Sequence, residues 1–132
     1  MGVYDSLEET REYFAHDRFA TENGMIIESY SDTESCTSVV LDERHKNANG
    51  GIMGGVMFTL ADFAFAVLAN KIHMPTVAQT VSVNYLSAPK GKKLFAKAHV
   101  RKDGKTSTVI IVDVTDDTGR DIAQFVGTGF KL

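Results

Sequence analysis

The sequence predicts an α+β fold in which an antiparallel sheet of about six strands wraps around one long central helix. Three observations predict this fold. Between Ile52 and Ala69 the only polar side chains are Thr59 and Asp62, and a helix that is apolar on nearly every side is a buried one. Two stretches before this run and four after it have the β-branched content and the turn residues of strands. A single buried helix needs a curved sheet to cover its apolar surface.

The first part of the chain, residues 1–24, is expected to form a helix and a connector. Residues 5–15 have the pattern of a short amphipathic helix, and Ser6 with Glu9 three positions later forms a capping box at its start. The polar connector ends in a turn signal at residues 23–24. A hairpin follows, with strands at residues 25–30 and 35–41.

A polar loop rich in Asn and Gly, residues 42–51, leads into the long helix, which is expected at residues 53–70. Pro75 prevents the helix from continuing. The remaining chain changes to a period of two, and its four strands are joined by short turns, which predicts an antiparallel meander. These strands are expected at residues 77–86, 94–102, 106–115 and 122–132.

Composition excludes several classes of protein. The 132 residues, 43% of them hydrophobic, fit a single domain over residues 1–132. A net charge of −3 gives no basic field, so we expect no nucleic-acid partner. Cys36 is the lone cysteine, which predicts no disulfide framework and a cytoplasmic location. We expect no membrane partner, because Asp62 in the middle of the apolar run favours a core helix over a membrane span.

Three groups around the start of the long helix are candidates for chemistry. The glycines at 50–51 and 54–55 leave backbone N–H groups that can hold an anion or an oxyanion, although they also suit a tight loop entering a helix. Asp62 is an acid in apolar surroundings, which is costly unless the carboxyl is paired, protonated or used. It is either a hydrogen-bonded core acid or a general base or nucleophile. Asn47 is either a turn former or a carbonyl ligand.

The spacing of these groups predicts how they could work together. Gly54 and Asp62 are eight positions apart, which separates them by about 12 Å along a helix. A hydrogen-bond donor and a base that act on one carbonyl must converge within a few ångströms. One copy of the helix cannot supply both. If both groups are catalytic, two helices around a two-fold axis must share each site, which predicts a dimer.

Other chemistries have little support. No pair of the four histidines has metal-ligand spacing, so we expect no metal and read each histidine as a surface or structural residue. The nucleophile-elbow, dinucleotide and P-loop motifs do not occur. The lysines and arginines at residues 90–93 and 101–105 read mainly as solvated turn charges, of which one or two could contact a phosphate.

Two groups of residues form a longer motif. The first consists of His45, Asn47, Gly50, Met53-Gly54-Gly55 and Phe58-Thr-Leu-Ala-Asp62. The second consists of Val83-Asn84-Tyr85-Leu86, Pro89, the stretch from His99 to Thr106, and Ala123 at the start of the last strand. Together they cover about residues 25–132 and resemble the PaaI-like branch of the hotdog-fold acyl-CoA thioesterases.

The resemblance implies a hotdog fold that pairs into homodimers with a continuous sheet, and often then into homotetramers. It implies hydrolysis of an acyl-CoA substrate without a cofactor. The Gly54 N–H would polarise the thioester carbonyl, Asn47 of the same subunit would help bind it, and Asp62 of the partner subunit would activate water or attack the carbonyl.

Three further residues are expected to bind substrate: Gly55, Met53 and Thr80. Met53 stands where the family usually has a histidine that helps shape the site. In some members a Ser or Thr early in the next strand holds the water. The alignment puts Ala78 there, and Thr80 is the candidate to replace it. Two alternatives stay open, which are a non-catalytic acyl-CoA-binding hotdog module and a hotdog dehydratase or hydratase.

Overall fold

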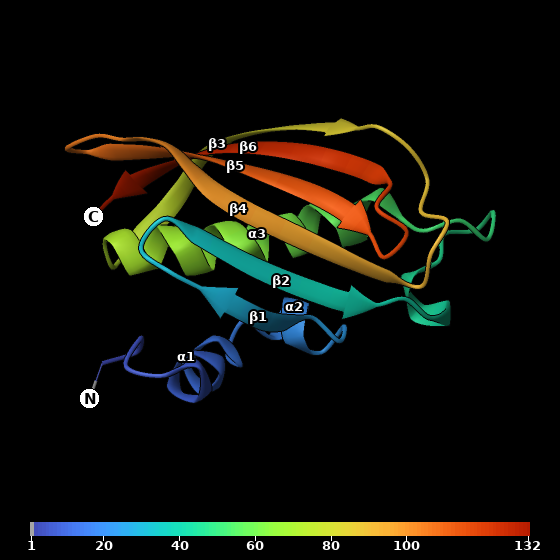
Figure 1. The fold of residues 1–132 in the computed structure, drawn as a ribbon, viewed down its shortest axis with the longest axis horizontal. Coiled ribbons are helices and arrows are strands. Elements are labelled where there is room, and N and C mark those ends of the chain that lie inside the picture. Colours follow the sequence, from blue (N-terminus) through green and yellow to red (C-terminus); the bar gives the residue numbers. More distant parts are fainter. Residues whose placement is uncertain (1) are drawn as a thin grey trace.

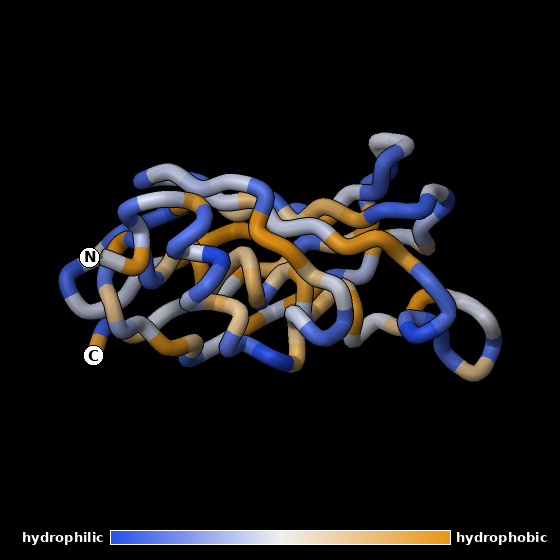
Figure 2. Tube along the Cα trace, turned by 90° about the horizontal axis from the view of Figure 1, so that it is seen from below, coloured by the Kyte–Doolittle hydropathy of each residue, from blue (hydrophilic) through white to orange (hydrophobic). Residues whose placement is uncertain are grey.

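The chain folds as a six-stranded antiparallel sheet that curves around one long helix, α3 (Gly54–Ile72). The computed structural model describes residues 2–132. Figure 1 shows α3 lying along the sheet, with the N-terminal helix α1 (Leu7–Phe14) beyond β1 (Ile26–Tyr30). Apolar segments gather in the middle of the molecule and hydrophilic loops project at its ends (Figure 2). The predicted fold class is therefore confirmed.

The helix α3 is the centre of the core. It begins one residue later and ends two residues later than the sequence predicts. By length and composition alone α3 could cross a membrane. Its contacts with all six strands and the complete burial of Leu60, Ala64 and Leu68 identify it as the core helix that the sequence predicts.

The strands pair in the order β1-β2-β4-β5-β6-β3. The expected first hairpin is present, because β1 and β2 pair antiparallel. On β6 the absence of a side chain at Gly127 lets the sheet approach α3, since a Cβ there would lie 2.8 Å from the Phe65 ring. The strands are β1 (Ile26–Tyr30), β2 (Glu34–Val40), β3 (Thr76–Tyr85), β4 (Lys93–Asp103), β5 (Ser107–Asp116) and β6 (Asp121–Lys131).

The predicted four-stranded meander is wrong in one connection. Strands β4, β5 and β6 form a meander, but β3 pairs with β6 at one edge of the sheet and β4 pairs with β2. The segment between β3 and β4 is not a hairpin turn. It is a crossing loop, residues 86–92, that passes the ends of β5 and β6. This arrangement puts β2 beside β4, so that all six strands form one sheet over α3.

The Asp116 carboxylate holds this crossing loop in place. It accepts hydrogen bonds from the backbone N–H groups of Lys90 (2.8 Å) and Gly91 (3.0 Å), and also from Thr118 and Arg120 in the next turn. These bonds, led by that of the Thr118 hydroxyl, hold the pKa of Asp116 well below its usual range. A residue that the sequence places in a turn therefore also fixes a loop 25 residues away.

Strand β3 is an edge strand that packs on the core through the partly buried Val81 and Val83. Most of its residues are exposed, including Val77 and Tyr85. Its outward N–H and C=O groups face no neighbouring strand within residues 2–132. An uncovered edge of this length is a template for pairing with another strand.

The N-terminal part contains two helices where the sequence predicts one. The predicted helix is α1 (Leu7–Phe14), and the Ser6 Oγ accepts the Glu9 N–H at 3.0 Å as its cap. The second helix, α2 (Arg18–Thr21), lies in the stretch that was expected to be a polar connector. At four residues α2 is too short for a periodic pattern. The burial of Ala20 against the core fixes it instead.

Candidate functional site

Asp62 lies on the one face of α3 that the sheet does not cover. Its carboxyl is half-buried and lines a pocket of about 250 Å³. Thr59, one turn earlier, lines the same pocket, and its hydroxyl donates to the Gly55 carbonyl at 2.8 Å. The other walls come from α2 and the core, through Asp17, Arg18, Phe19, Ala20 and Phe63. The short helix α2 therefore places a second carboxylate, Asp17, beside Asp62.

The surroundings of Asp62 disfavour its charged form. Burial raises the pKa of the Asp62 carboxyl above its usual value, and the neighbouring Asp17 carboxylate raises it further. Burial also raises the pKa of Asp17, while the nearby His16 lowers it. Such a carboxyl holds its proton to a higher pH than an exposed aspartate and is a stronger base when ionised.

Replacing Asp17 by asparagine is expected to lower the pKa of Asp62, because it removes the nearby negative charge while keeping the side-chain shape. The expected measurement is a titration of the Asp62 carboxyl carbon by NMR in both proteins. The wild-type midpoint should lie above the ordinary 3.8 and that of the variant closer to it. Asp5→Asn is the matched control, because Asp5 is another aspartate of the N-terminal segment and is not among the groups that shift the pKa of Asp62. An unchanged or higher midpoint in the Asp17 variant would contradict this account.

Gly54, the second candidate group, is the first residue of α3. A first helical residue has no intrahelical partner for its N–H, and the helix dipole makes that end positive. The Tyr85 ring lies beside Gly54, since a Cβ on Gly54 would be 3.4 Å from the ring. Gly54 and Tyr85 line a groove of about 300 Å³ together with Ile52, Met57, Leu86, Ser87 and Ala88.

Backbone hydrogen bonds close the loop before α3. The Met53 N–H donates to the His45 carbonyl at 2.9 Å, and the Asn47 N–H donates to the Gly51 carbonyl at 2.7 Å. The Asn47 Oδ1 accepts from the N–H groups of Asn49 and Gly51. Asn47 is therefore a turn former, as one of its two readings predicts. Its Nδ2 group has no hydrogen-bond partner within residues 2–132, so it stays free to donate to a ligand.

His45 anchors this loop to the N-terminal segment. The side chain is buried, at 1% exposure, and its Nδ1 accepts the Asp42 N–H at 2.9 Å. The ring proton is therefore on Nε2, which donates to the Asn23 carbonyl at 2.8 Å. Next to it, Arg44 donates to the Glu22 carbonyl at 2.9 Å. Both ring nitrogens of His45 are used by the fold, which agrees with its predicted structural role.

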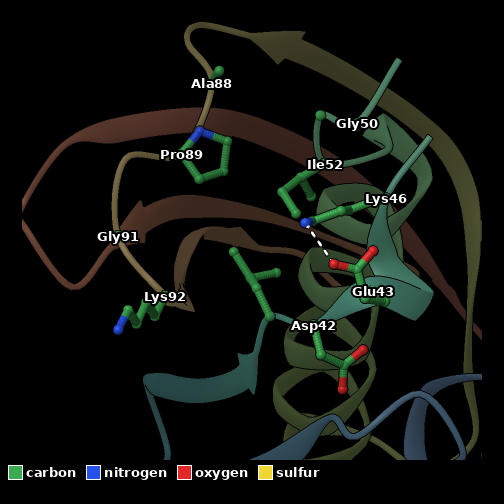
Figure 3. A pocket seen from close by; sticks show the side chains of 11 residues that line it. Asp42, Glu43, Lys46, Gly50, Ile52, Ala88, Pro89, Gly91 and Lys92 are labelled. Atoms are coloured by element: carbon green, nitrogen blue, oxygen red, sulfur yellow. Dashed lines mark hydrogen bonds and ion pairs between the residues drawn. The ribbon is translucent and has the colours of Figure 1, made fainter. Parts of the chain in front are cut away.

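A larger pocket, of about 550 Å³, continues from the Gly54 groove, with which it shares Ile52 and Ala88. Figure 3 shows the crossing loop with Pro89 on one side and the loop before α3 with Ile52 and Lys46 on the other. The Lys46 ammonium is 2.9 Å from the Glu43 carboxylate. Lys92 supplies a second positive charge at the margin of this pocket.

The structure separates the predicted site residues into two groups within one chain. Asn47, Gly54 and Gly55 belong to the loop and the first turn of α3, and the Met53 side chain folds over Gly55, with its Cε 3.7 Å from the Cβ position. Asp62 lies eight residues further along α3, about 12 Å away, in a different pocket.

Thr80 is placed apart from both groups. Val81 pairs with Gly127, which faces Phe65 of α3, so the preceding residue Thr80 points to the opposite face of the sheet. Within one chain, Thr80 therefore shares no pocket with Asp62 or Gly54. Among the aromatic and methionine residues of α3, Phe58 is exposed at 37%, while Met57, Phe63 and Phe65 are buried.

Sequence reasoning missed Asp17, Phe19 and Tyr85 as residues of these pockets. Asp17 and Phe19 precede Asp62 by more than 40 positions, and no local motif connects them. Tyr85 is part of a motif that the sequence singles out, but its contact with Gly54 depends on the pairing of β3 with β6. All three depend on packing between distant elements.

Comparison with known proteins gives consistent matches. The profile of the thioesterase superfamily matches residues 49–123. The acyl-coenzyme A thioesterase 13 of Homo sapiens is 38% identical over 88 residues, which are 64% of this chain and 63% of that protein. The chain thus spans less than two thirds of the length of this curated relative.

Solved structures extend the likeness to nearly the whole fold. The PaaI protein from the phenylacetic acid degradation operon of E. coli superposes with a TM-score of 0.82 at 25% identity, over 96% of both chains. A hypothetical thioesterase protein with coenzyme A from Streptococcus pneumoniae TIGR4 superposes with a TM-score of 0.80 at 26% identity, over 89% of this chain and 94% of that one.

Proposed function

The chain belongs to the thioesterase superfamily and has the hotdog fold of its PaaI-like members, and we propose that it hydrolyses an acyl-CoA thioester to a free acid and CoA. The observation that carries this proposal is that α3 bears two groups, each of which can supply half of an active site. One end of the helix offers a free N–H donor at Gly54, and the middle offers Asp62, a carboxyl with a raised pKa. We also propose that the enzyme is located in the cytoplasm.

In the proposed reaction the thioester carbonyl accepts the Gly54 N–H, and the Asn47 Nδ2 group helps to bind it. The Asp62 carboxylate takes a proton from water, and the water oxygen attacks the carbonyl carbon. The Gly54 N–H, at the positive end of α3, stabilises the oxyanion that forms. When the intermediate collapses, the carbon–sulfur bond breaks and the CoA sulfur takes up the proton. Attack by the Asp62 carboxylate itself is the variant mechanism, in which the carbon–sulfur bond breaks, CoA leaves as the thiolate and an acyl–Asp62 anhydride forms. Water that attacks the Asp62 carbonyl carbon of this anhydride would release the free acid and leave labelled solvent oxygen in Asp62 during single turnover.

We infer that each site is shared between two subunits. Gly54 and Asp62 line different pockets of one chain, and the distance of about 12 Å between them is too long for both to act on one carbonyl. The exposed edge of β3 supports a two-fold partner, because pairing of two β3 strands would extend the sheet across a homodimer. That pairing would bring the two α3 helices side by side. A homotetramer built from two such dimers is part of the proposal.

Mixing an Asn47→Ala chain with an Asp62→Ala chain tests the shared site. Each heterodimer would contain one site with both substitutions and one with neither. Random exchange of subunits is therefore expected to restore up to about one quarter of the wild-type activity. The measurement is thiol release from acyl-CoA before and after exchange, with each variant exchanged against itself as the control. No recovery despite proven subunit exchange would contradict a shared site.

The CoA part of the substrate is proposed to follow the groove that starts at Gly54. From there the groove passes Ile52 and Ala88 and opens into the larger pocket in Figure 3. Lys46 and Lys92 line that pocket together with Asp42 and Glu43, so its two positive charges balance its two carboxylates, and we propose that the lysines contact the CoA phosphates. The CoA-bound structural relative supports CoA as the carrier group.

The structure gives evidence about the two alternative functions, a dehydratase or hydratase and a non-catalytic acyl-CoA-binding module. A dehydratase would need a histidine near the helix start. Met53 occupies that position, and both ring nitrogens of the nearby His45 are bonded inside the fold. A non-catalytic acyl-CoA-binding module would not need Asp62. A panel of acyl-CoAs separates these functions, because tight binding without thiol release would support the module and thiol release would support the hydrolase.

A further inference from the structure

We propose that α2 forms a wall of the acyl-binding site and that Phe19 determines which acyl groups the protein prefers. This inference rests on the proposed function, and it assigns the substrate's acyl part to the pocket beside Asp62. The N-terminal segment that contains α2 precedes residues 49–123, which the superfamily profile matches, so its role is a feature of this chain rather than of the profile.

The exposure of Phe19 is the first observation. The side chain is 76% exposed, the highest value among the large apolar residues within residues 2–132. It nevertheless lines the same pocket as Asp62, together with the buried Phe63. An exposed aromatic ring at the rim of a pocket is apolar surface that a ligand can cover.

The fold holds α2 firmly in this place. Ala20 is buried, so α2 packs on the core through a small residue and the neighbouring Phe19 projects over the pocket. The Thr21 hydroxyl donates to the Ala15 carbonyl at 3.0 Å, and the Asn23 side chain donates to the Phe19 carbonyl at 2.7 Å. His45 then ties Asn23 to the loop before α3. Packing and hydrogen bonds therefore hold in place the backbone of α2 that carries Phe19.

The chemistry of the pocket favours the acyl group over the CoA part. Its charged residues are Asp17, Asp62 and Arg18, so an anionic phosphate would meet two carboxylates and one guanidinium. Its other walls are mostly apolar, from Phe19, Ala20 and Phe63. With about 250 Å³, the pocket lies below the usual range of about 300–1,000 Å³ for ligand sites. Short, medium or aromatic acyl groups fit these properties.

The acyl chain is expected to reach Phe19 only when it is long enough. Its carbonyl carbon must lie at Asp62, and Phe19 lies at the rim of the pocket that begins there. An acetyl group would end near Asp62, whereas an octanoyl or phenylacetyl group would contact the Phe19 ring. Contacts made equally in the bound substrate and the transition state change KM more than kcat.

The test compares wild type with Phe19→Ala and Phe19→Leu on acetyl-, butyryl-, octanoyl- and phenylacetyl-CoA. In Phe19→Ala the ratio of octanoyl to acetyl kcat/KM should fall about tenfold, mainly through KM, because the longer chain loses apolar contact. Phe19→Leu should recover most of this loss. Tyr13→Ala is the matched control, since Tyr13 is an exposed aromatic residue of the same segment that does not line the pocket.

Binding of non-hydrolysable thioether analogues with the same acyl groups, measured by calorimetry, makes the test independent of catalysis. If wild type releases no thiol but Phe19→Ala weakens octanoyl-analogue binding selectively, the proposed hydrolysis fails and the acyl site stands. If wild type hydrolyses the panel and Phe19→Ala changes all substrates in parallel or none, the acyl site is wrong and hydrolysis stands. Dissociation of the dimer in Phe19→Ala, with an unchanged preference, would also overturn the inference, because the ring would then be a subunit contact.

Discussion

Replacing Asp62 by asparagine is expected to lower kcat by a factor of about 10²–10⁴, which is the usual contribution of a positioned general base. Asparagine keeps the shape of the side chain but cannot accept a proton from water. The measurement is thiol release from the best acyl-CoA of the panel, with Asp62→Ala as a second variant. Among residues 2–132 the Asp62 carboxyl, which lines a pocket, has no hydrogen bond or ion pair that asparagine would have to replace.

The same substitution is not expected to destabilise the fold. Because the folded-state pKa of Asp62 is raised above its unfolded value, its contribution to stability is fully present below the unfolded pKa and is lost as the pH rises through the folded pKa. At pH 7 the ionised carboxylate is therefore unfavourable. The Asp62→Asn protein should have a Tm at pH 7 equal to or above that of wild type, and this difference should shrink as the pH is lowered toward 4.

This combination of lost activity and kept or gained stability separates a catalytic role from a structural one. Thiol release that survives both Asp62→Asn and Asp62→Ala would remove Asp62 from the mechanism. A strong fall in Tm would instead indicate a structural acid. Lost activity with tight binding of the thioether analogues would show that the site is intact and lacks the base.

Replacing Gly54 by proline is expected to lower kcat by about 10²–10³, because it deletes the backbone N–H that stabilises the oxyanion. The fold should accept the change. Gly54 is the first residue of α3, a position that favours proline. Met53 already has φ −64° and ψ 135°, and this extended ψ is the conformation that a residue before proline prefers. No other single substitution in the site removes the proposed donor with so little expected change in structure.

The matched control is Gly54→Ala, which adds the same Cβ beside Tyr85 but keeps the N–H. A Cβ at this position lies 3.4 Å from the ring, which is ordinary van der Waals contact. The two variants then differ in the N–H and in the Cγ and Cδ atoms of the proline ring, so the ratio of their kcat values gives an upper limit on the contribution of the N–H. If Gly54→Pro folds and exchanges subunits normally and its kcat equals that of Gly54→Ala, the N–H is not the oxyanion donor.

Much of the fold could be predicted from the sequence, because its signals are local. The apolar run around Asp62 predicts α3 to within two residues at each end, and β-branched content with turn residues predicts all six strands. The error was the place of β3. Short turns suggested that β3 neighbours β4, but the crossing loop and its bonds to Asp116 carry the chain past two strands. Strand order depends on contacts between distant segments, which no local pattern contains.

The residues of the candidate site also divide into those that the sequence identifies and those that only the fold brings together. The sequence by itself determined Asn47, Gly54 and Asp62 as candidates, because an acid in an apolar helix and glycines at its start are visible as residue types with a spacing. It also determined that one helix cannot bring Gly54 and Asp62 together, since that follows from the rise per residue.

Only the tertiary structure decided what surrounds these groups. Folding placed Asp17 and Phe19 of α2 beside Asp62, Tyr85 beside Gly54, and Thr80 on the far face of the sheet. It also gave His45 its buried bonds to Asn23 and Asp42. The physical reason is that a pocket consists of side chains from elements far apart in the chain. Which of them meet is fixed by how the sheet packs around α3, while the chemistry of each residue is already fixed by its type.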